Sequence, residues 1–278
     1  MSTERRPLRS LAIGAAVIGG TVALVALVLG SLFLLRDRPG ARSFDDALEE
    51  FRSSNPNASD DLITLVRRPP SGVYLAEASG SMSISFPPTS QDYGATAPVT
   101  IRHVGDRCWA TIVDFNSAFQ QQWDYCISDG TVTEISNRTT TRWDLGAASV
   151  TNTATFECSP PGEILRASTR TGDRTEHECT GSSDEVDGIT ISAVSFEALG
   201  PEELVIGGRP VQSVHFREVD LLSGAQRGST TIDFWYSTED MLLLRMARRV
   251  DLRTASPVGD ITYKENGSWT LMSRDPSR

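Results

Sequence analysis

The sequence predicts an all-β domain, built as one large antiparallel sheet or an incomplete (half) barrel, with one short helix before it and a single transmembrane helix ahead of both. Three observations support this prediction. Residues 72–273 alternate apolar and polar side chains in short runs separated by turn residues. Residues 44–52 carry apolar side chains at helical spacing, and residues 11–35 contain no charged side chain.

The apolar run over residues 11–35 is long enough to cross a membrane. About 20 apolar residues, each rising 1.5 Å, span a hydrocarbon core of roughly 30 Å. A cleaved signal peptide is the alternative, but its apolar region is about 7 to 15 residues long and ends at small residues. Here the run leads directly into Arg36-Asp37-Arg38, which favours an uncleaved anchor.

The long part of the chain beyond this segment is expected to lie outside the cytoplasm. Three arginines precede the segment and three follow it closely, so positive charge alone does not decide the orientation. All four cysteines lie on the C-terminal side, and disulfides persist in oxidising compartments. We therefore predict a single-pass protein of the cell membrane, with residues 1–10 cytoplasmic, residues 11–35 in the membrane and the C-terminal domain extracytoplasmic.

A short amphipathic helix is predicted within the juxtamembrane segment, residues 36–71. Ser43 is followed three residues later by Asp46, which resembles a capping box at the start of a helix. We expect the apolar side of this helix to dock on the β domain and residues 53–71 to form a linker. The apolar residues that share this side are Phe44, Ala47, Leu48 and Phe51.

The β domain is predicted to occupy residues 72–273. Two hairpin turns are expected, at Ser79-Gly80 and at Asp129-Gly130. The clearest strand covers residues 242–252, where alternate apolar residues share one face and Arg248 is the exception. A two-sheet sandwich is the alternative to a single large sheet. Further strands are expected near residues 98–104, 149–156, 189–194, 211–221, 228–236 and 259–272.

Four cysteines permit three disulfide connectivities. A hairpin centred near Ser117 would place Cys108 opposite Cys126, with Cβ atoms about 4.5 to 5.5 Å apart, which is close to what a disulfide needs. Cys158 and Cys179 would then pair. A zinc site is the competing interpretation, but the sequence has no CxxC and the four sulfurs are widely spaced, so we expect no metal.

No catalytic motif is visible in the sequence. GxSxG, P-loop and GxGxxG motifs are absent, and the single lysine, Lys264, does not complete an SxxK motif. His103, His177 and His215 lie far apart and lack the spacing of metal ligands. The net charge of −10 offers no basic surface for nucleic acid. We expect no enzymatic activity, no cofactor and no nucleic-acid partner.

Two groups of residues suggest binding. The acidic segment 173–187 could hold calcium, but it lacks the EF-hand spacing, and a solvated loop is the simpler interpretation. The tryptophans are expected to pack in the core, although a curved sheet can also enclose an apolar cavity that aromatic side chains line. The five tryptophans are Trp109, Trp123, Trp143, Trp235 and Trp269.

Five short segments carry a resemblance to known proteins: Arg68-Pro69-Pro70-Ser71-Gly72-Val73-Tyr74, Cys108-Trp109, Trp123-Asp124-Tyr125-Cys126, Gly207-Gly208-Arg209-Pro210-Val211 and Gly259-Asp260-Ile261-Thr262-Tyr263-Lys264-Glu265. With them, the sequence resembles a group of uncharacterised actinobacterial proteins that are anchored by a single membrane segment and have no assigned activity. More remotely, a small helix ahead of many antiparallel strands resembles the half-barrel of LolA-like and LppX-like carriers, which hold lipid between sheet and helices. Those carriers are soluble or lipid-anchored.

These observations favour a non-enzymatic, membrane-anchored domain that binds a lipid-like or other apolar ligand of the cell envelope. The alternative is a protein-interaction or scaffold module of the envelope with no small-molecule ligand. The first requires an internal cavity of roughly a few hundred Å³, whereas the second requires a filled core and an exposed patch.

Overall fold

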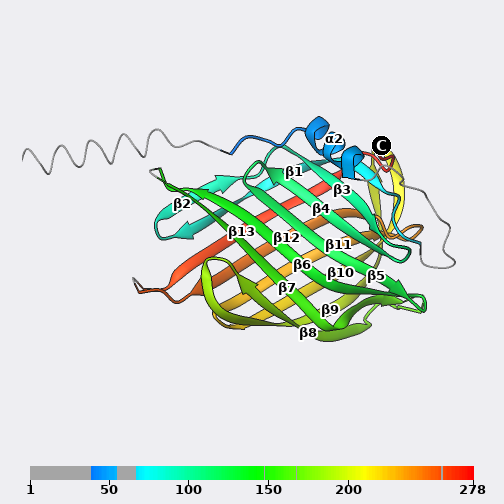
Figure 1. Cartoon of the computed structure of the whole chain (residues 1–278). Helices are drawn as coiled ribbons and strands as arrows, with labels where there is room; N and C mark the ends of the chain where they lie inside the picture. Colours follow the sequence, from blue (N-terminus) through cyan, green and yellow to red (C-terminus); the bar gives the residue numbers. More distant parts are fainter. Residues whose placement is uncertain (1–38, 55–66, 147, 167, 258) are drawn as a thin grey trace, which may run out of the picture. The chain divides into compact units, whose positions relative to one another are not determined.

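Figure 1 shows a computed structural model of the chain, which describes residues 39–54, 67–146, 148–166, 168–257 and 259–278. The expected cytoplasmic tail and transmembrane segment, residues 1–35, lie outside the described residues. Within these ranges, no helix has the length and apolar character needed to cross a membrane.

The chain divides into two compact units. One comprises residues 39–143 and 151–278, and it contains the helix and almost all of the strands. Of the other unit, the structure describes only residues 144–146 and 148–150, where the amide of Leu145 donates to the carbonyl of Ala148 at 2.9 Å.

The described elements follow one another in the order α2 (Phe44–Ser54), β1 (Gly72–Ser85), β2 (Pro88–Asp92), β3 (Thr96–Val104), β4 (Cys108–Asn116), β5 (Phe119–Ser128), β6 (Thr131–Asp144), β7 (Ser149–Arg166), β8 (Arg174–Ser183), β9 (Val186–Ile206), β10 (Arg209–Gly224), β11 (Gln226–Ser237), β12 (Leu243–Thr254) and β13 (Ile261–Leu271).

The strands form one continuous sheet that closes on itself. From β3 to β13, each strand pairs with its neighbours in chain order, and β1 joins the two ends by pairing with both β3 and β13. Twelve strands therefore close an antiparallel barrel, while the short β2 pairs beside the second half of β1. The predicted all-β class with one short helix is confirmed. The barrel is complete, and a single closed sheet excludes the two-sheet sandwich.

The hairpin turn expected at Ser79-Gly80 is wrong, because β1 runs unbroken through it. Gly80 instead allows β1 to approach β13 closely. A Cβ on Gly80 would lie 2.5 Å from the Cα of Gly267 on β13, and a Cβ on Gly267 would overlap the ring of Tyr93. Two facing glycines thus make room for a tyrosine ring inside the barrel.

Two further local predictions concern a turn and an acidic segment. The turn at Asp129-Gly130 is confirmed, with φ angles of 51° and 75° that suit the tight connection of β5 to β6. The acidic segment 173–187 was expected to be a loop, and this is wrong: it contains the whole of β8, the turn after it and the first two residues of β9. Its side chains alternate, so that Glu176 and Glu178 are exposed while Cys179 is buried.

Helix α2 packs on the outer surface of the barrel beside β1 and β3 (Figure 1). The Ser43 hydroxyl accepts a hydrogen bond from the amide of Asp45 at 3.1 Å and caps the first turn. The apolar side of the helix covers Val73, which is fully buried although it lies on the outer face of β1. The residues of α2 that bury against Val73 are Ala47, Leu48 and Phe51.

Inward-facing and outward-facing side chains alternate along each strand, so the burial pattern reveals what fills the barrel. On β5, every second residue from Phe119 to Ile127 is buried, including Trp123 and the polar Gln121. Much of the interior is aromatic, as the tryptophans predict. The large aromatic side chains that face inward and are almost fully buried include Trp109, Trp123, Phe196, Phe216, Phe234 and Trp269.

Candidate functional site

The barrel interior also contains charged side chains, which a core normally excludes. Arg248 is the exception in the apolar pattern of β12, where it faces inward between Met246 and Val250. Its Nη1 donates to Oε2 of Glu265 at 2.8 Å, and the exposed fractions of the two side chains are 14% and 0%. A buried guanidinium and a buried carboxylate are tolerable together because each compensates the other's charge.

Glu265 is held by donors from several parts of the barrel. Its Oε1 accepts from the hydroxyl of Tyr93 at 2.5 Å and from Nε2 of Gln121 at 3.2 Å. Its Oε2 accepts from the hydroxyl of Tyr263 at 2.6 Å and from Arg248. Burial and the charge of Glu265 raise the pKa of both tyrosines, so both hydroxyls stay protonated as donors. We call these five residues the Glu265 cluster.

A second group of carboxyls has far fewer partners. Glu218 and Asp220 both face inward from β10, and Glu134 faces inward from β6. Glu134 accepts from Nδ2 of Asn137 at 2.9 Å. By contrast, Oε2 of Glu218 and Oδ1 of Asp220 are buried without a hydrogen-bond partner, and Glu218 is only 4% exposed. We call Glu134, Glu218 and Asp220 the acidic cluster.

Burial determines the charge state of the acidic cluster. It raises the pKa of Glu134 to about 8 and that of Asp220 to about 7. The pKa of Glu218 is raised by burial, and further by the charges of Asp220 and Glu134. Arg248 lowers the pKa of Glu218 and Asp220, so it connects the two clusters electrostatically. The acidic cluster therefore holds protons near neutral pH.

Aromatic side chains border the acidic cluster. Tyr125 is the register partner of Glu134, and its hydroxyl lies 3.1 Å from that of Tyr236. Phe234 contacts Trp123 edge to face at 6.1 Å between ring centroids. A ligand beside the carboxyls would therefore meet π faces and phenolic hydroxyls as well.

A cavity of about 280 Å³ approaches this region between β7, β8 and β9. Phe196 and Phe216 belong to its lining and stack with ring centroids 5.0 Å apart. Phe196 is the register partner of Glu218, and Phe216 lies two residues before Glu218 on the same face of β10. The two rings therefore adjoin Glu218, which is not itself among the residues that line the cavity. The charged residues that line the cavity are Glu163, Arg166, Asp173 and Arg174.

A larger cavity, of about 510 Å³, lies elsewhere on the barrel. Its lining is mixed, with Ile206 and Val211 beside the charged Arg209, Asp240 and Arg274. Arg274 pairs with Asp240 at 3.2 Å, so its charge is already compensated. This cavity shows no unpartnered carboxyl comparable to Glu218 among the residues described around it.

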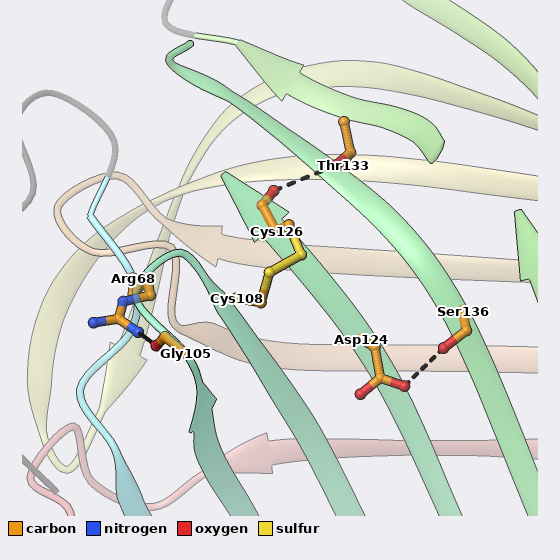
Figure 2. Close-up of a disulfide and its surroundings, with 7 residues drawn as sticks. All are labelled: Arg68, Gly105, Cys108, Asp124, Cys126, Thr133 and Ser136. Atoms are coloured by element: carbon orange, nitrogen blue, oxygen red, sulfur yellow. Dashed lines mark hydrogen bonds between the residues drawn. A yellow bond between two sulfur atoms is a disulfide. The ribbon is translucent and has the colours of Figure 1, made fainter. Parts of the chain in front are cut away.

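The four cysteines form two disulfides, in the pairing favoured by hairpin geometry. Figure 2 shows Cys108 joined to Cys126 across β4 and β5, with Asp124 accepting from the Ser136 hydroxyl nearby at 2.8 Å. These side chains project from the outer face of the barrel, because Trp123 and Tyr125 beside them face inward. This disulfide therefore contributes no surface to the interior.

The second disulfide, between Cys158 and Cys179, packs against Val194. His177 lies close enough to form, with these two sulfurs, the single described group of three potential metal ligands. Because both sulfurs are oxidised to a disulfide, they are not available as thiolate ligands.

The remaining histidines have structural partners. A ring nitrogen of His103 lies 2.9 Å from the carbonyl of Pro69, and His215 stacks on Trp235 with ring centroids 4.1 Å apart. Nε2 of His215 lies 2.9 Å from Oδ1 of Asp233. Neither histidine belongs to the interior clusters.

Sequence reasoning missed the acidic cluster, although the sequence contains a pattern that could have revealed it. Phe216, Glu218, Asp220 and Leu222 occupy alternate positions of one strand, so they share a face. A buried phenylalanine and a buried leucine on that face imply that the two carboxyls between them are buried too. The exception at Arg248 on β12 was the second indication of a charged interior.

Comparison with known proteins identifies no family for the chain. No family model and no curated protein matches it. Among solved structures, it is similar to the hypothetical lipoprotein YmcC of Escherichia coli K12, with 14% identity over 82% of this chain and 97% of that one. The TM-score is 0.32, which is too low to support an argument about function.

Proposed function

We propose that this chain is a non-enzymatic, membrane-anchored extracytoplasmic domain whose barrel interior binds a small ligand of the cell envelope. The observation that carries this proposal is the pair of unpartnered carboxyl oxygens, on Glu218 and Asp220, beside the aromatic lining of a cavity. A buried polar atom without a partner costs roughly 1–3 kcal/mol. A ligand that supplied the missing hydrogen bonds would offset this cost.

The lining of the cavity indicates an amphiphilic ligand rather than a purely apolar one. Phe196, Phe216 and Ile164 provide apolar surface, while Arg166 and Asp173 add charges. Seven of the eleven described residues that line the cavity are polar or charged, so a ligand there would meet polar groups beside the two phenyl rings. An envelope component with a compact apolar body and a polar head fits this lining better than a long acyl chain does, since the cavity measures only about 280 Å³.

The location of the domain is part of the proposal and rests on the sequence of residues 11–35. An uncharged segment of this length would hold the barrel at the outer face of the membrane. Such a tether would keep the cavity within reach of envelope components without making the protein a shuttle between membranes.

Native mass spectrometry of the full chain in mild detergent tests the proposal. We expect a small-molecule adduct that is lost on denaturation. Ala198 is 2% exposed and lines the cavity, so Ala198→Leu should lower adduct occupancy at least tenfold by filling it. Val211→Phe, which enlarges a side chain at the other cavity, is the matched control and should leave the adduct in place.

The proposal fails if wild-type protein has a clean apo mass and does not take up an uncharged fluorescent probe such as N-phenyl-1-naphthylamine. That result would favour the alternative function, an interaction or scaffold module. The outer face of β9 and β10 would then be the surface to examine, because Val205 and Leu221 are 69% and 60% exposed there.

A further inference from the structure

The interior holds more ionisable carboxyls than cationic groups. In the described part of the barrel interior around Glu265, four carboxyls, those of Glu134, Glu218, Asp220 and Glu265, accompany one guanidinium, that of Arg248. Nη1 of Arg248 is engaged by Glu265, which also has three neutral donors. Arg248 thus acts on Glu218 and Asp220 through its charge, while its described hydrogen bond is to Glu265.

We infer, on the basis of the proposed function above, that the ligand carries a positively charged nitrogen, as an ammonium or a guanidinium, and that the acidic cluster binds this head group. A carboxyl oxygen without a hydrogen-bond partner accepts from an N–H donor, and a cationic donor makes the stronger bond. Glu218 and Asp220 each offer such an oxygen inside the barrel.

The arrangement of the carboxyls favours a polyatomic cation over a metal ion. Among the described residues, the single group of three side chains placed to hold a metal ion is Cys158, His177 and Cys179, so the acidic cluster does not form one. A single small metal ion requires its oxygen ligands to converge at about 2.0 to 2.6 Å. An ammonium or guanidinium group presents several N–H donors in different directions, so it can serve carboxyls that are farther apart.

The aromatic surroundings suit the same head group. Phe196 and Phe216 adjoin Glu218, and Tyr125 lies beside Glu134. A cation over a π face is attracted by the ring quadrupole, whereas an anion is repelled by it. The aromatic rings beside Glu218 thus suit a cationic head group, and the apolar body of the ligand would remain against the two phenyl rings.

Protons occupy the acidic cluster when the ligand is absent, because burial raises the pKa of its members. A bound cation would favour the ionised carboxyls and displace these protons, so affinity should increase with pH between about 6 and 8. The titratable and charged groups that belong to the cluster or act on it come from β5 (Tyr125, Asp124), β6 (Glu134), β10 (Glu218, Asp220), β11 (Tyr236), β12 (Arg248) and β13 (Tyr263, Glu265).

Three probes with the same aromatic body and different heads test this inference on the full chain in detergent. They are 2-phenylethylamine (cationic), 2-phenylethanol (neutral) and 3-phenylpropionate (anionic), titrated by calorimetry at pH 7.5. We expect the amine to bind at least tenfold more tightly than the alcohol and to release protons, measured in two buffers with different ionisation enthalpies.

Isosteric variants distinguish binding of the ligand's charged head group from binding of its apolar body. Glu218→Gln should abolish the preference for the amine. This variant should still bind 2-phenylethanol, which would show that its barrel is folded and its cavity open. Glu178→Gln removes an exposed carboxylate of β8 that points away from the interior, and it should retain the full preference.

The inference is overturned if the alcohol or the carboxylate binds as tightly as the amine, or if Glu218→Gln keeps the preference. In those cases the interior still binds small molecules, and the proposed function stands. If no probe binds and no native adduct is found, the proposed function fails together with the inference.

Discussion

Replacing Arg248 by methionine removes one partner of the buried ion pair and is the sharpest test of the polar interior. Methionine keeps much of the aliphatic stem but leaves the charge of Glu265, whose side chain is 0% exposed, without its cation. Breaking a buried pair from one side costs roughly 3–5 kcal/mol. Since Tyr93, Gln121 and Tyr263 still donate to Glu265, we expect about 3 kcal/mol, at the lower end of that range.

Guanidinium unfolding at pH 7 measures this cost as the change in the free energy of unfolding. For a domain of about 200 residues, each kcal/mol shifts Tm by roughly 2–4 °C, so a drop of about 6–12 °C should accompany the change. Arg249→Met is the matched control, because Arg249 is the next residue on β12 and is exposed. It should change stability by less than about 0.5 kcal/mol.

A second substitution distinguishes the lost ion pair from lost packing. Arg248→Met combined with Glu265→Gln removes both charges and leaves a neutral amide among the same donors. We expect it to recover more than half of the stability lost in the single variant. Equal stability losses for Arg248→Met and Arg249→Met would refute the description of the interior as a paired, desolvated network.

Three further predictions concern other parts of the interior. Burial raises the pKa of Glu134 to about 8, so between about pH 4.5 and pH 8 this carboxyl is protonated in the folded state and ionised in the unfolded chain. Its contribution to stability is therefore fully present below about pH 4.5 and is lost as the pH rises through about 8. Tm should therefore fall between pH 5 and pH 9 in scanning calorimetry, and Glu134→Gln should flatten this dependence, whereas Glu178→Gln on the exposed face should not. Gly267→Ala should cost about 2 kcal/mol or more in denaturant unfolding, because the methyl group meets the Tyr93 ring and displaces its hydroxyl from Glu265; a cost below about 0.5 kcal/mol would contradict this packing. Replacing Cys158 and Cys179 by serine opens a 21-residue connection and should cost about 3 kcal/mol, measured against wild-type protein under oxidising conditions, and an unchanged unfolding midpoint would contradict a stabilising role.

Several features of the fold follow from local sequence patterns. The apolar stripe of α2, the Asp129-Gly130 turn and the alternation of β12 each depend on residues close together in the chain. Such features can be predicted from one sequence. The cysteine pairing across β4 and β5 is similar, because it depends on a single hairpin.

Features that depend on distant residues could not be predicted in this way. Gly80 was expected to mark a turn because glycine permits one, but its role is set by Gly267 and Tyr93, which approach it only after the barrel closes. Closure itself depends on β1 pairing with β13, almost 190 positions away in the chain. A single strand pattern does not reveal which strand will be its neighbour.

The candidate site illustrates the same limit. Glu134, Glu218 and Glu265 lie on β6, β10 and β13, and each alone resembles an ordinary charged residue of a strand. Their burial can be predicted only when the inward face of each strand is known. The local exception at Arg248 showed that something polar was inside, but it could not show how many carboxyls shared the space.

The central claim, that the barrel interior binds a ligand at the acidic cluster, is tested most directly by a crystal structure of the full chain grown with 2-phenylethylamine. We expect density for the amine beside the Phe196–Phe216 pair, with its nitrogen within about 3 Å of a carboxyl oxygen of Glu218 or Asp220. Density confined to the outer face of the barrel, or an interior unchanged at saturating amine, would contradict the claim.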